Sequence, residues 1–392
     1  MASGSSGAPL DPAMATETLG AAEPTLAWHK PPRPRMEALD GLRGILALHV
    51  VVFHLLGPLP GAASSVERYA PILLQAWFPV DVFFVMSGFV MSYVYGATFA
   101  KEVTGRDYYL FFAARVARLY PVHLFALAIL ALGTLPFVYR QPDFLSPEGR
   151  YAWTAGLASL FMLHSPWIDH RTWNYPSWSI SAEWHAYALF PFAASFGWLR
   201  RPSVAIAGLV LCVAIPLAVY LHGTGPDPEP TNTPIVLLRV IPLFLAGMLV
   251  HVLLEKGYFA RVGTMGALLV IGAIVVLLDV PGLHYLAGPL IPLLVVVALR
   301  NPAVRSVLSS RWMLFLGAIS YSLYMTHALV VIFGLGLWVR RIAPALGFDP
   351  KASDAATWSV LGLAAVASIV LGWLTFRFVE VPGRRMIVKR LT

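Results

Sequence analysis

Charged residues and cysteine are both scarce in this chain. Only 12% of its 392 residues are charged and its mean hydropathy is +0.70, whereas about a quarter of the residues of a soluble globular domain are charged. A water-soluble protein is therefore excluded. The single cysteine, Cys212, excludes an intrachain disulfide and a Cys-rich zinc site. Its position inside an apolar run indicates a small packing residue, and the sequence predicts no metal site.

The excess of basic residues does not indicate a nucleic-acid partner. The formal net charge is +8, but the basic residues stand in short clusters between long apolar runs and form no single stripe. Membrane proteins show this arrangement because Lys and Arg gather in their cytoplasmic loops. The charge pattern therefore favours a membrane protein.

Long apolar runs occupy most of the chain. A helix that crosses a bilayer needs about 20 mostly apolar residues. The sequence predicts an all-α, polytopic transmembrane helical bundle of about ten spans. The ten stretches are residues 42–60, 72–97, 119–139, 178–198, 203–222, 235–254, 263–280, 283–299, 313–338 and 355–378.

The distribution of basic residues tests this count. With a cytoplasmic N-terminus and ten spans, 20 of the 28 Lys and Arg residues fall at cytoplasmic ends, as the positive-inside rule requires. Counting the shorter apolar stretch 153–164 as a further span would move Arg200 and Arg201 outside. We therefore expect 153–164 to be a re-entrant or interfacial segment. We expect a protein of the inner membrane with both termini in the cytoplasm.

The two ends of the chain differ from its middle. Residues 1–34 are rich in Ala, Gly, Ser and Pro, which predicts a disordered cytoplasmic tail. The first apolar run, from Leu42, is expected to be an uncleaved anchor rather than a signal peptide. A membrane domain follows over residues 35–385. The last residues, 386–392, are expected to form a short basic cytoplasmic tail on the anionic inner leaflet.

The first predicted span carries the densest set of ionisable residues, EALDGLRGILALHVVVFH. Such residues are costly inside a membrane, so each is a candidate functional residue. Arg43 and His54 are eleven residues apart, which places them on one helix face with a rise of about 16 Å between them. Asp40, three residues before Arg43, is positioned to pair with it. One face thus runs from an arginine at the cytoplasmic mouth to a histidine near the middle of the membrane.

The second and third spans add one acid and two bases. Asp81 lies in the apolar sequence WFPVDVFFVMSGFVM and needs a partner, an arginine or histidine from a neighbouring helix. Arg115 and Arg118 share a helix face near the cytoplasmic surface. They either contact phosphate groups or serve only as a positive-inside anchor.

Two later spans carry polar side chains with more than one possible role. Glu183, in WSISAEWHAYALF, can orient a histidine or form a structural ion pair with Arg239 or Arg43. In the ninth span, ISYSLYMTHALVV, two tyrosines and His327 are spaced to share one helix side. They belong either to a site or to the core.

Seven motifs occur in order between about residues 35 and 385. The chain thereby resembles the acyltransferase 3 family of multi-pass membrane proteins, which modify surface polysaccharides, lipopolysaccharide O-antigens, secreted glycans and some antibiotics. The resemblance implies a membrane-bound O-acyltransferase, with acetyl as the expected acyl group, whose membrane domain covers residues 35–385. The motifs are LDGLRG followed by VVVFH, VDVFFVMSGFVM, RVARLYPVHL, WSISAEWHAYALFP, RVIPLFLAGMLV, ISYSLYMTH and FRFVEVPGRR.

The resemblance also assigns roles to residues of this sequence. The first-helix histidine and arginine of the family fall on His54 and Arg43. Its R-x-x-R pair falls on Arg115 and Arg118, and the acid of its W-S-x-x-x-E-W motif falls on Glu183. The expected catalytic residues are His54, Arg43, Glu183 and Asp81.

The chain departs from the family pattern in two places. Val381 stands where the family usually has a basic residue after Glu380, so Glu380 is assigned no site role. In addition, no extracytoplasmic hydrolase-like domain is expected after the helices, so a second transfer step would need a partner protein.

The resemblance and the helix spacing together predict a mechanism. Arg43, Arg115 and Arg118 would hold the phosphates of cytoplasmic acyl-CoA, and His54 would meet the thioester. The acceptor is expected to be a hydroxyl of a carbohydrate or lipid-linked glycan. His54 acts either as a general base or through an acyl-histidine intermediate. A transporter or flippase of a lipid-linked sugar is the alternative, and a scaffold for a polysaccharide machine is a third.

Overall fold

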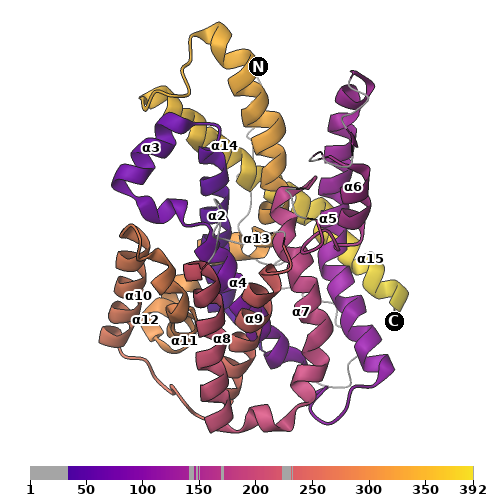
Figure 1. Ribbon diagram of the computed structural model, residues 1–392, viewed down its shortest axis with the longest axis vertical. Coiled ribbons are helices and arrows are strands. Elements are labelled where there is room, and N and C mark those ends of the chain that lie inside the picture. Colours follow the sequence, from indigo (N-terminus) through magenta and orange to yellow (C-terminus); the bar gives the residue numbers. More distant parts are fainter. Residues whose placement is uncertain are drawn as a thin grey trace, which may run out of the picture.

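The structure, a computed structural model, describes residues 34–140, 145–146, 149, 151–168, 172–222, 231 and 233–391. Every regular element within these ranges is a helix, as Figure 1 shows. The all-α prediction is therefore confirmed for the described residues. The predicted tail, apart from Pro34, lies outside them.

The first half of the chain supplies the helices that carry most of the predicted site residues. They are α2 (Glu37–Leu56), α3 (Pro60–Tyr69), η1 (Pro71–Leu74), α4 (Trp77–Tyr95), α5 (Gly105–Arg140), α6 (Trp153–Leu160), η3 (Tyr175–Ser177), α7 (Trp178–Ser195) and η4 (Gly197–Arg200).

The second half contains further α-helices and three π-helical segments, η6, η7 and η9. Its elements are α8 (Pro202–His222), α9 (Val236–Glu255), α10 (Thr264–Asp279), η5 (His284–Leu290), α11 (Ile291–Arg300), α12 (Pro302–Leu308), α13 (Arg311–Leu329), η6 (Val330–Leu335), η7 (Trp338–Ile342), η8 (Ala343–Leu346), α14 (Ala355–Thr375), η9 (Phe376–Glu380) and α15 (Val381–Leu391).

All ten predicted stretches fall on helices, but fewer helices meet the requirements of a span. Among the described residues seven are long and apolar enough to cross a membrane, or up to eight if the bent pair His284–Arg300 and Pro302–Leu308 is one span. The count of ten is thus not confirmed. Helix α6 has only eight residues, which is too short to cross a bilayer and agrees with the prediction of a partial segment.

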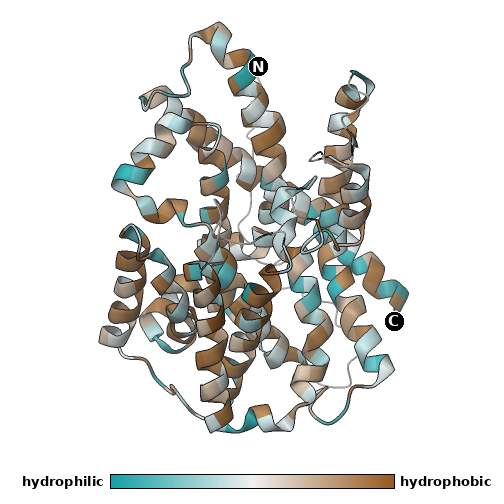
Figure 2. Ribbon diagram, in the orientation of Figure 1, coloured by the Kyte–Doolittle hydropathy of each residue, from teal (hydrophilic) through white to brown (hydrophobic). Residues whose placement is uncertain are grey.

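Helices α4 and α9 form the centre of the bundle, and more exposed helices such as α8 surround them. In α4 and α9, 72% of the most apolar stretch is buried inside the protein, against 22% in α8. Figure 2 shows hydrophobic residues along α8, as expected for a helix that faces lipid. Gly88 and Gly247 lie where α4 and α9 cross. A Cβ at either position would collide with the backbone of the other helix, so small residues permit the close contact.

Helices α2 and α13 run parallel and in register. A Cβ on Gly44 would lie 2.6 Å from the backbone nitrogen of Gly317, and a Cβ on Gly317 would collide with the backbone oxygen of Asp40. Ten residues beyond each glycine stand His54 and His327, about 15 Å further along the axes. Gly44, the second glycine of the LDGLRG motif, therefore sets the contact that brings the two histidines to the same level along the helix axes.

The substitution Gly317→Ala is expected to destabilise the protein by about 1–3 kcal/mol, because its methyl group forces α2 and α13 apart. It should also reduce the acyl transfer that the sequence resemblance predicts, because the two histidines separate. Thermal unfolding in detergent and an acyl-transfer assay measure these effects. The matched control is Gly362→Ala in α14, where a Cβ meets open space. Equal stability and activity in the two variants would contradict the glycine contact.

Candidate active site

The core of the candidate site is a pair of histidines. His54 Nδ1 and His327 Nε2 lie 3.2 Å apart. His327 Nδ1 lies 2.7 Å from the carbonyl oxygen of Tyr324 and must donate to it, so His327 Nε2 is an acceptor. His54 Nδ1 lies 2.9 Å from the carbonyl oxygen of Val50 and likewise carries a proton. These hydrogen bonds assign the tautomer, and they leave the lone pair of His54 on Nε2.

A tyrosine from a third segment covers this pair. The ring of Tyr175, in η3, has its centroid 4.9 Å from that of His54 and 6.0 Å from that of His327. The preceding residue, Asn174, donates its side-chain amide to the carbonyl oxygen of Met325 at 3.0 Å. The segment before α7 is thereby fastened to α13 beside the histidines.

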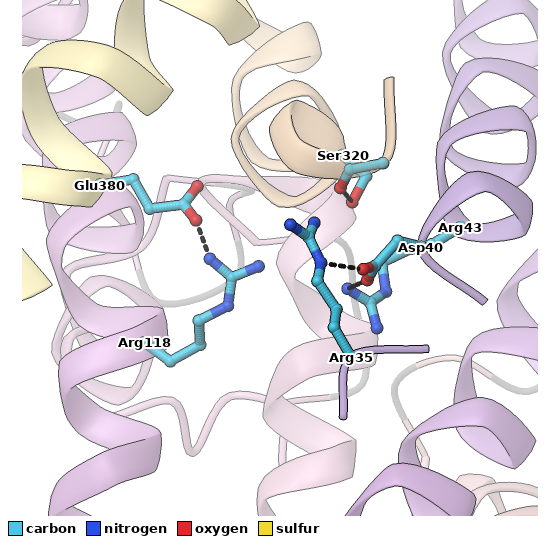
Figure 3. A network of polar contacts seen from close by, with 7 residues as sticks. Arg35, Asp40, Arg43, Arg118, Ser320 and Glu380 are labelled. Carbon is cyan, nitrogen blue, oxygen red and sulfur yellow. Dashed lines mark hydrogen bonds and ion pairs between the residues drawn. The ribbon is translucent and has the colours of Figure 1, made fainter. Parts of the chain in front are cut away.

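The other end of α2 carries arginines. Asp40 accepts hydrogen bonds from Arg35 Nε at 2.6 Å and from Arg43 Nη1 at 3.3 Å, so the predicted pairing of Asp40 with Arg43 is confirmed. Arg35 and Arg43 remain 49% and 29% exposed. In the view of Figure 3, Arg35 lies between Arg118 and the Asp40–Arg43 pair. We call Arg35, Arg43, Arg115 and Arg118 the arginine cluster.

Arg118 pairs with a residue near the C-terminal end of the described chain. Its guanidinium forms an ion pair with Glu380 (Figure 3). Glu380 is buried, and its other oxygen accepts a hydrogen bond from Ser322 at 2.6 Å. Asp40 thus pairs with Arg35 and Arg43, and Glu380 pairs with Arg118.

Glu183 lies on α7 within the electrostatic reach of this cluster. It accepts a hydrogen bond from Tyr187 at 2.8 Å and interacts electrostatically with Arg115 and Arg43. Arg115 itself donates to Tyr95 at 2.8 Å and lies over the Tyr95 ring. Of the roles predicted for Glu183, its contacts favour the electrostatic interaction with Arg43 over the orientation of a histidine.

Asp81 has the partner that the sequence required, an arginine from a neighbouring helix. Arg239 Nε lies 2.8 Å from Asp81 Oδ1, and each side chain is only 1% exposed. Tyr220 donates to the second carboxylate oxygen at 2.6 Å. Arg239 also reaches the carbonyl oxygen of Trp77 at 3.3 Å. Asp81 therefore joins α4, α8 and α9 in a closed ion pair, and its described contacts are separate from the histidine pair.

Sequence reasoning missed Tyr175 and Arg35, left the role of His327 open, and assigned Glu380 no site role. His327 and Glu380 lie in motifs that it quoted, but no sequence spacing indicates that they meet residues of α2 and α5. Tyr175 belongs to a polar loop between two apolar stretches, which was the available signal. Arg35 lies before the first predicted span, where the sequence indicates only one of the basic residues at a cytoplasmic end.

The geometry defines a class of protein. Apolar helices long enough to cross a membrane enclose a histidine pair, and an arginine cluster lies about 16 Å away along α2 by helix rise. The chain is a multi-pass membrane protein with a polar site inside its helical bundle.

The chain belongs to the acyltransferase 3 family: the acyltransferase domain of that family matches residues 36–377. The protein is therefore an acyltransferase. The resemblance seen in the sequence motifs is confirmed.

Curated relatives carry related names. The chain is 28% identical over 393 residues to "Acyltransferase MdmB" of Streptomyces mycarofaciens, covering 92% of this chain and 95% of that protein. It is 21% identical over 380 residues to "O-acetyltransferase OatA" of Staphylococcus aureus strain NCTC 8325, covering 89% of this chain and 57% of the relative. No solved structure matches.

The substitution Asp81→Asn is expected to lower the free energy of unfolding by about 3–5 kcal/mol, because it leaves the Arg239 charge buried without its counter-ion. Unfolding in detergent measures this loss. Asp279→Asn, at the exposed end of α10, is the control and should change stability little. A variant at Asp81 with normal stability but a large loss of kcat would show instead that Asp81 acts in the reaction.

Proposed function

We propose that this protein transfers an acyl group, most simply acetyl, from cytoplasmic acyl-CoA to a hydroxyl of a carbohydrate or glycosylated acceptor, with His54 as the general base. The observation that carries the proposal is the placement of two sites on one helix. Arg43 stands near one end of α2, and His54, eleven residues later, contacts His327.

The arginine cluster supports a phosphate-bearing donor. Arg43 and Arg118 are 29% and 23% exposed and so are accessible from one side. Arginine binds phosphate through parallel N–H groups. Asp40 and Glu380 hold three of these side chains in place by ion pairs, and several guanidinium groups gathered in one region are suited to the phosphates of coenzyme A.

The distance along α2 supports a thioester at His54. The rise from Arg43 to His54 is about 16 Å, a depth that the extended pantetheine arm of coenzyme A can span. The phosphates then remain at the arginine cluster while the thioester carbon reaches the histidine pair.

The tautomers of the pair support base catalysis. The acceptor hydroxyl gives its proton to His54 Nε2 as its oxygen forms the new C–O bond with the acyl carbon. The C–S bond breaks, and the departing thiolate takes the proton from Nε2. The resulting products are the ester and coenzyme A. While His54 is charged, its Nδ1–H is stabilised by Val50 and by His327 Nε2. An acyl group carried on His54 Nε2 is the second route.

Glu183 and Asp81 support the site in this proposal. Glu183 acts on the donor-binding arginines through its charge, and Asp81 holds helices together through Arg239. We place the arginine cluster on the cytoplasmic side of the inner membrane, where acyl-CoA is made, on the basis of the positive-inside distribution. The name of one relative, "O-acetyltransferase OatA", agrees with transfer to a hydroxyl group.

The variant His54→Ala is expected to lower kcat by about 10²–10⁴-fold with little change in the KM for acyl-CoA, because it removes the general base alone. Arg43→Ala should raise the KM for acyl-CoA about tenfold through the loss of a charge-assisted hydrogen bond. Purified protein with labelled acyl-CoA provides both measurements.

The controls are His222→Ala and Arg341→Ala, whose side chains are exposed at other places. Full activity in both His54→Ala and Arg43→Ala would refute the proposed site. Movement of an unmodified lipid-linked sugar across liposomes, with no thioester consumed, would favour the transporter.

A further inference from the structure

Between α5, α6 and α7 lies a set of buried polar side chains that contains more hydrogen-bond acceptors than donors. His123, Ser159, His164 and Asn174 are each 0% exposed. Each has one buried polar atom without a hydrogen-bond partner among the described residues: His123 Nδ1, Ser159 Oγ, His164 Nδ1 and Asn174 Oδ1. We call these four residues the acceptor shell.

The protonation of His123 follows from its neighbour. Its Nε2 lies 2.6 Å from the carbonyl oxygen of Ser159. A carbonyl oxygen only accepts, so Nε2 carries the proton. The other ring nitrogen, Nδ1, therefore presents a lone pair.

The protonation of His164 follows by the same reasoning through a hydroxyl group. Ser177 Oγ donates its single proton to the carbonyl oxygen of Asn174 at 2.6 Å. The contact of 3.0 Å between Ser177 Oγ and His164 Nε2 must then use a proton on Nε2. Burial lowers the pKa of His164 to about 3, so the ring stays neutral and Nδ1 keeps its lone pair at neutral pH.

Asn174 contributes a third acceptor. Its amide nitrogen donates to the carbonyl oxygen of Met325, which fixes the orientation of the amide. Asn174 Oδ1 is then an acceptor without a hydrogen-bond partner among the described residues. His123 Nδ1, His164 Nδ1 and Asn174 Oδ1 are thus three buried lone pairs that need donors, and the single hydroxyl of Ser159 can supply at most one of them. Leaving such groups unsatisfied is costly, and O–H groups are the donors of suitable size and charge.

The acceptor shell adjoins the histidine pair. Asn174 is followed directly by Tyr175, whose ring packs on His54. Met325, held by Asn174, is two residues before His327. His123 and His164 interact electrostatically, and His164 is linked to Asn174 through Ser177. A molecule held here by its hydroxyl groups would therefore lie next to the proposed base.

We infer that the acceptor shell is the subsite for the acyl acceptor and that it selects polyhydroxylated molecules through their O–H groups. This inference rests on the proposed function. One hydroxyl meets His54 Nε2, while neighbouring hydroxyls donate to His164 Nδ1 and Asn174 Oδ1, and the Tyr175 ring offers an apolar face to a sugar. Ordered water is the other source of O–H donors, and the test separates the two.

The test uses the purified full chain, labelled acyl-CoA and methyl α-D-glucopyranoside as the polyol probe. The fully O-methylated glucoside, which lacks O–H donors, is the matched control compound. His164→Leu should raise the KM for the polyol about tenfold, and by much more than it changes the KM for acyl-CoA. His164→Gln, which keeps an amide donor and an acceptor, should restore much of the loss. His222→Leu, on the exposed end of α8, should behave as the wild type.

Four results would overturn the inference. They are equal changes in the KM values for donor and polyol, inhibition by the O-methylated glucoside as strong as by the parent sugar, a loss of melting temperature alone, and thiol release from acyl-CoA without ester formation on the polyol. The third result would indicate that the shell holds only structural water. A wild-type protein that releases no thiol at all would refute the proposed function itself and the inference with it.

Discussion

The close contact between α2 and α13 is the constraint on which the rest of the site depends. The two backbones touch at Gly44 and Gly317, and the helices continue in parallel for ten residues to His54 and His327. Because both helices rise at the same rate per residue, contact at one point fixes the level of the histidines at another. The hydrogen bond between the two rings then needs no flexible loop to place either side chain.

Buried ion pairs hold the helices around α2 and α13 to one another. The Asp81–Arg239 pair joins α4 to α9, and the Arg118–Glu380 pair joins α5 to the end of η9. Charges of this kind are expensive to bury and are kept only with a partner. In one pair both side chains are almost fully covered, whereas Arg118 stays partly exposed. The same type of interaction therefore closes one pair off inside the bundle and leaves an arginine partly exposed in the other.

Sequence patterns were sufficient for the features that depend on local spacing. The apolar runs predicted where helices lie, and three- and eleven-residue intervals predicted the Asp40–Arg43 pair and the shared face of Arg43 and His54. The need of a buried acid for a base predicted a partner for Asp81. The number of spans was less accessible, because length and hydropathy alone do not distinguish a crossing helix from a shorter buried one.

Contacts between distant segments were beyond the same reasoning. His327 lies 273 residues after His54, and no periodicity indicates that α13 packs parallel to α2. Glu380 was set aside because Val381 follows it, yet its burial beside Arg118 does not depend on that neighbour. The tautomers of His54, His123 and His164 depend on which carbonyl or hydroxyl oxygen lies next to each ring, and only coordinates supply that.

The C-terminal helix α15 extends the region of positive electrostatic potential around Arg118. It begins beside Pro121 of α5, where Gly383 makes close contact, and Val388 packs further back on Ala117. It therefore carries Arg384, Arg385, Lys389 and Arg390 along α5 from the level of Arg118. A positive field of this extent accelerates the approach of a polyanion and weakens as ionic strength rises. Under the proposed function, salt would thus control how fast a phosphate-bearing donor arrives, while the proposed chemistry at the histidines, deep among the helices, would be largely shielded from it.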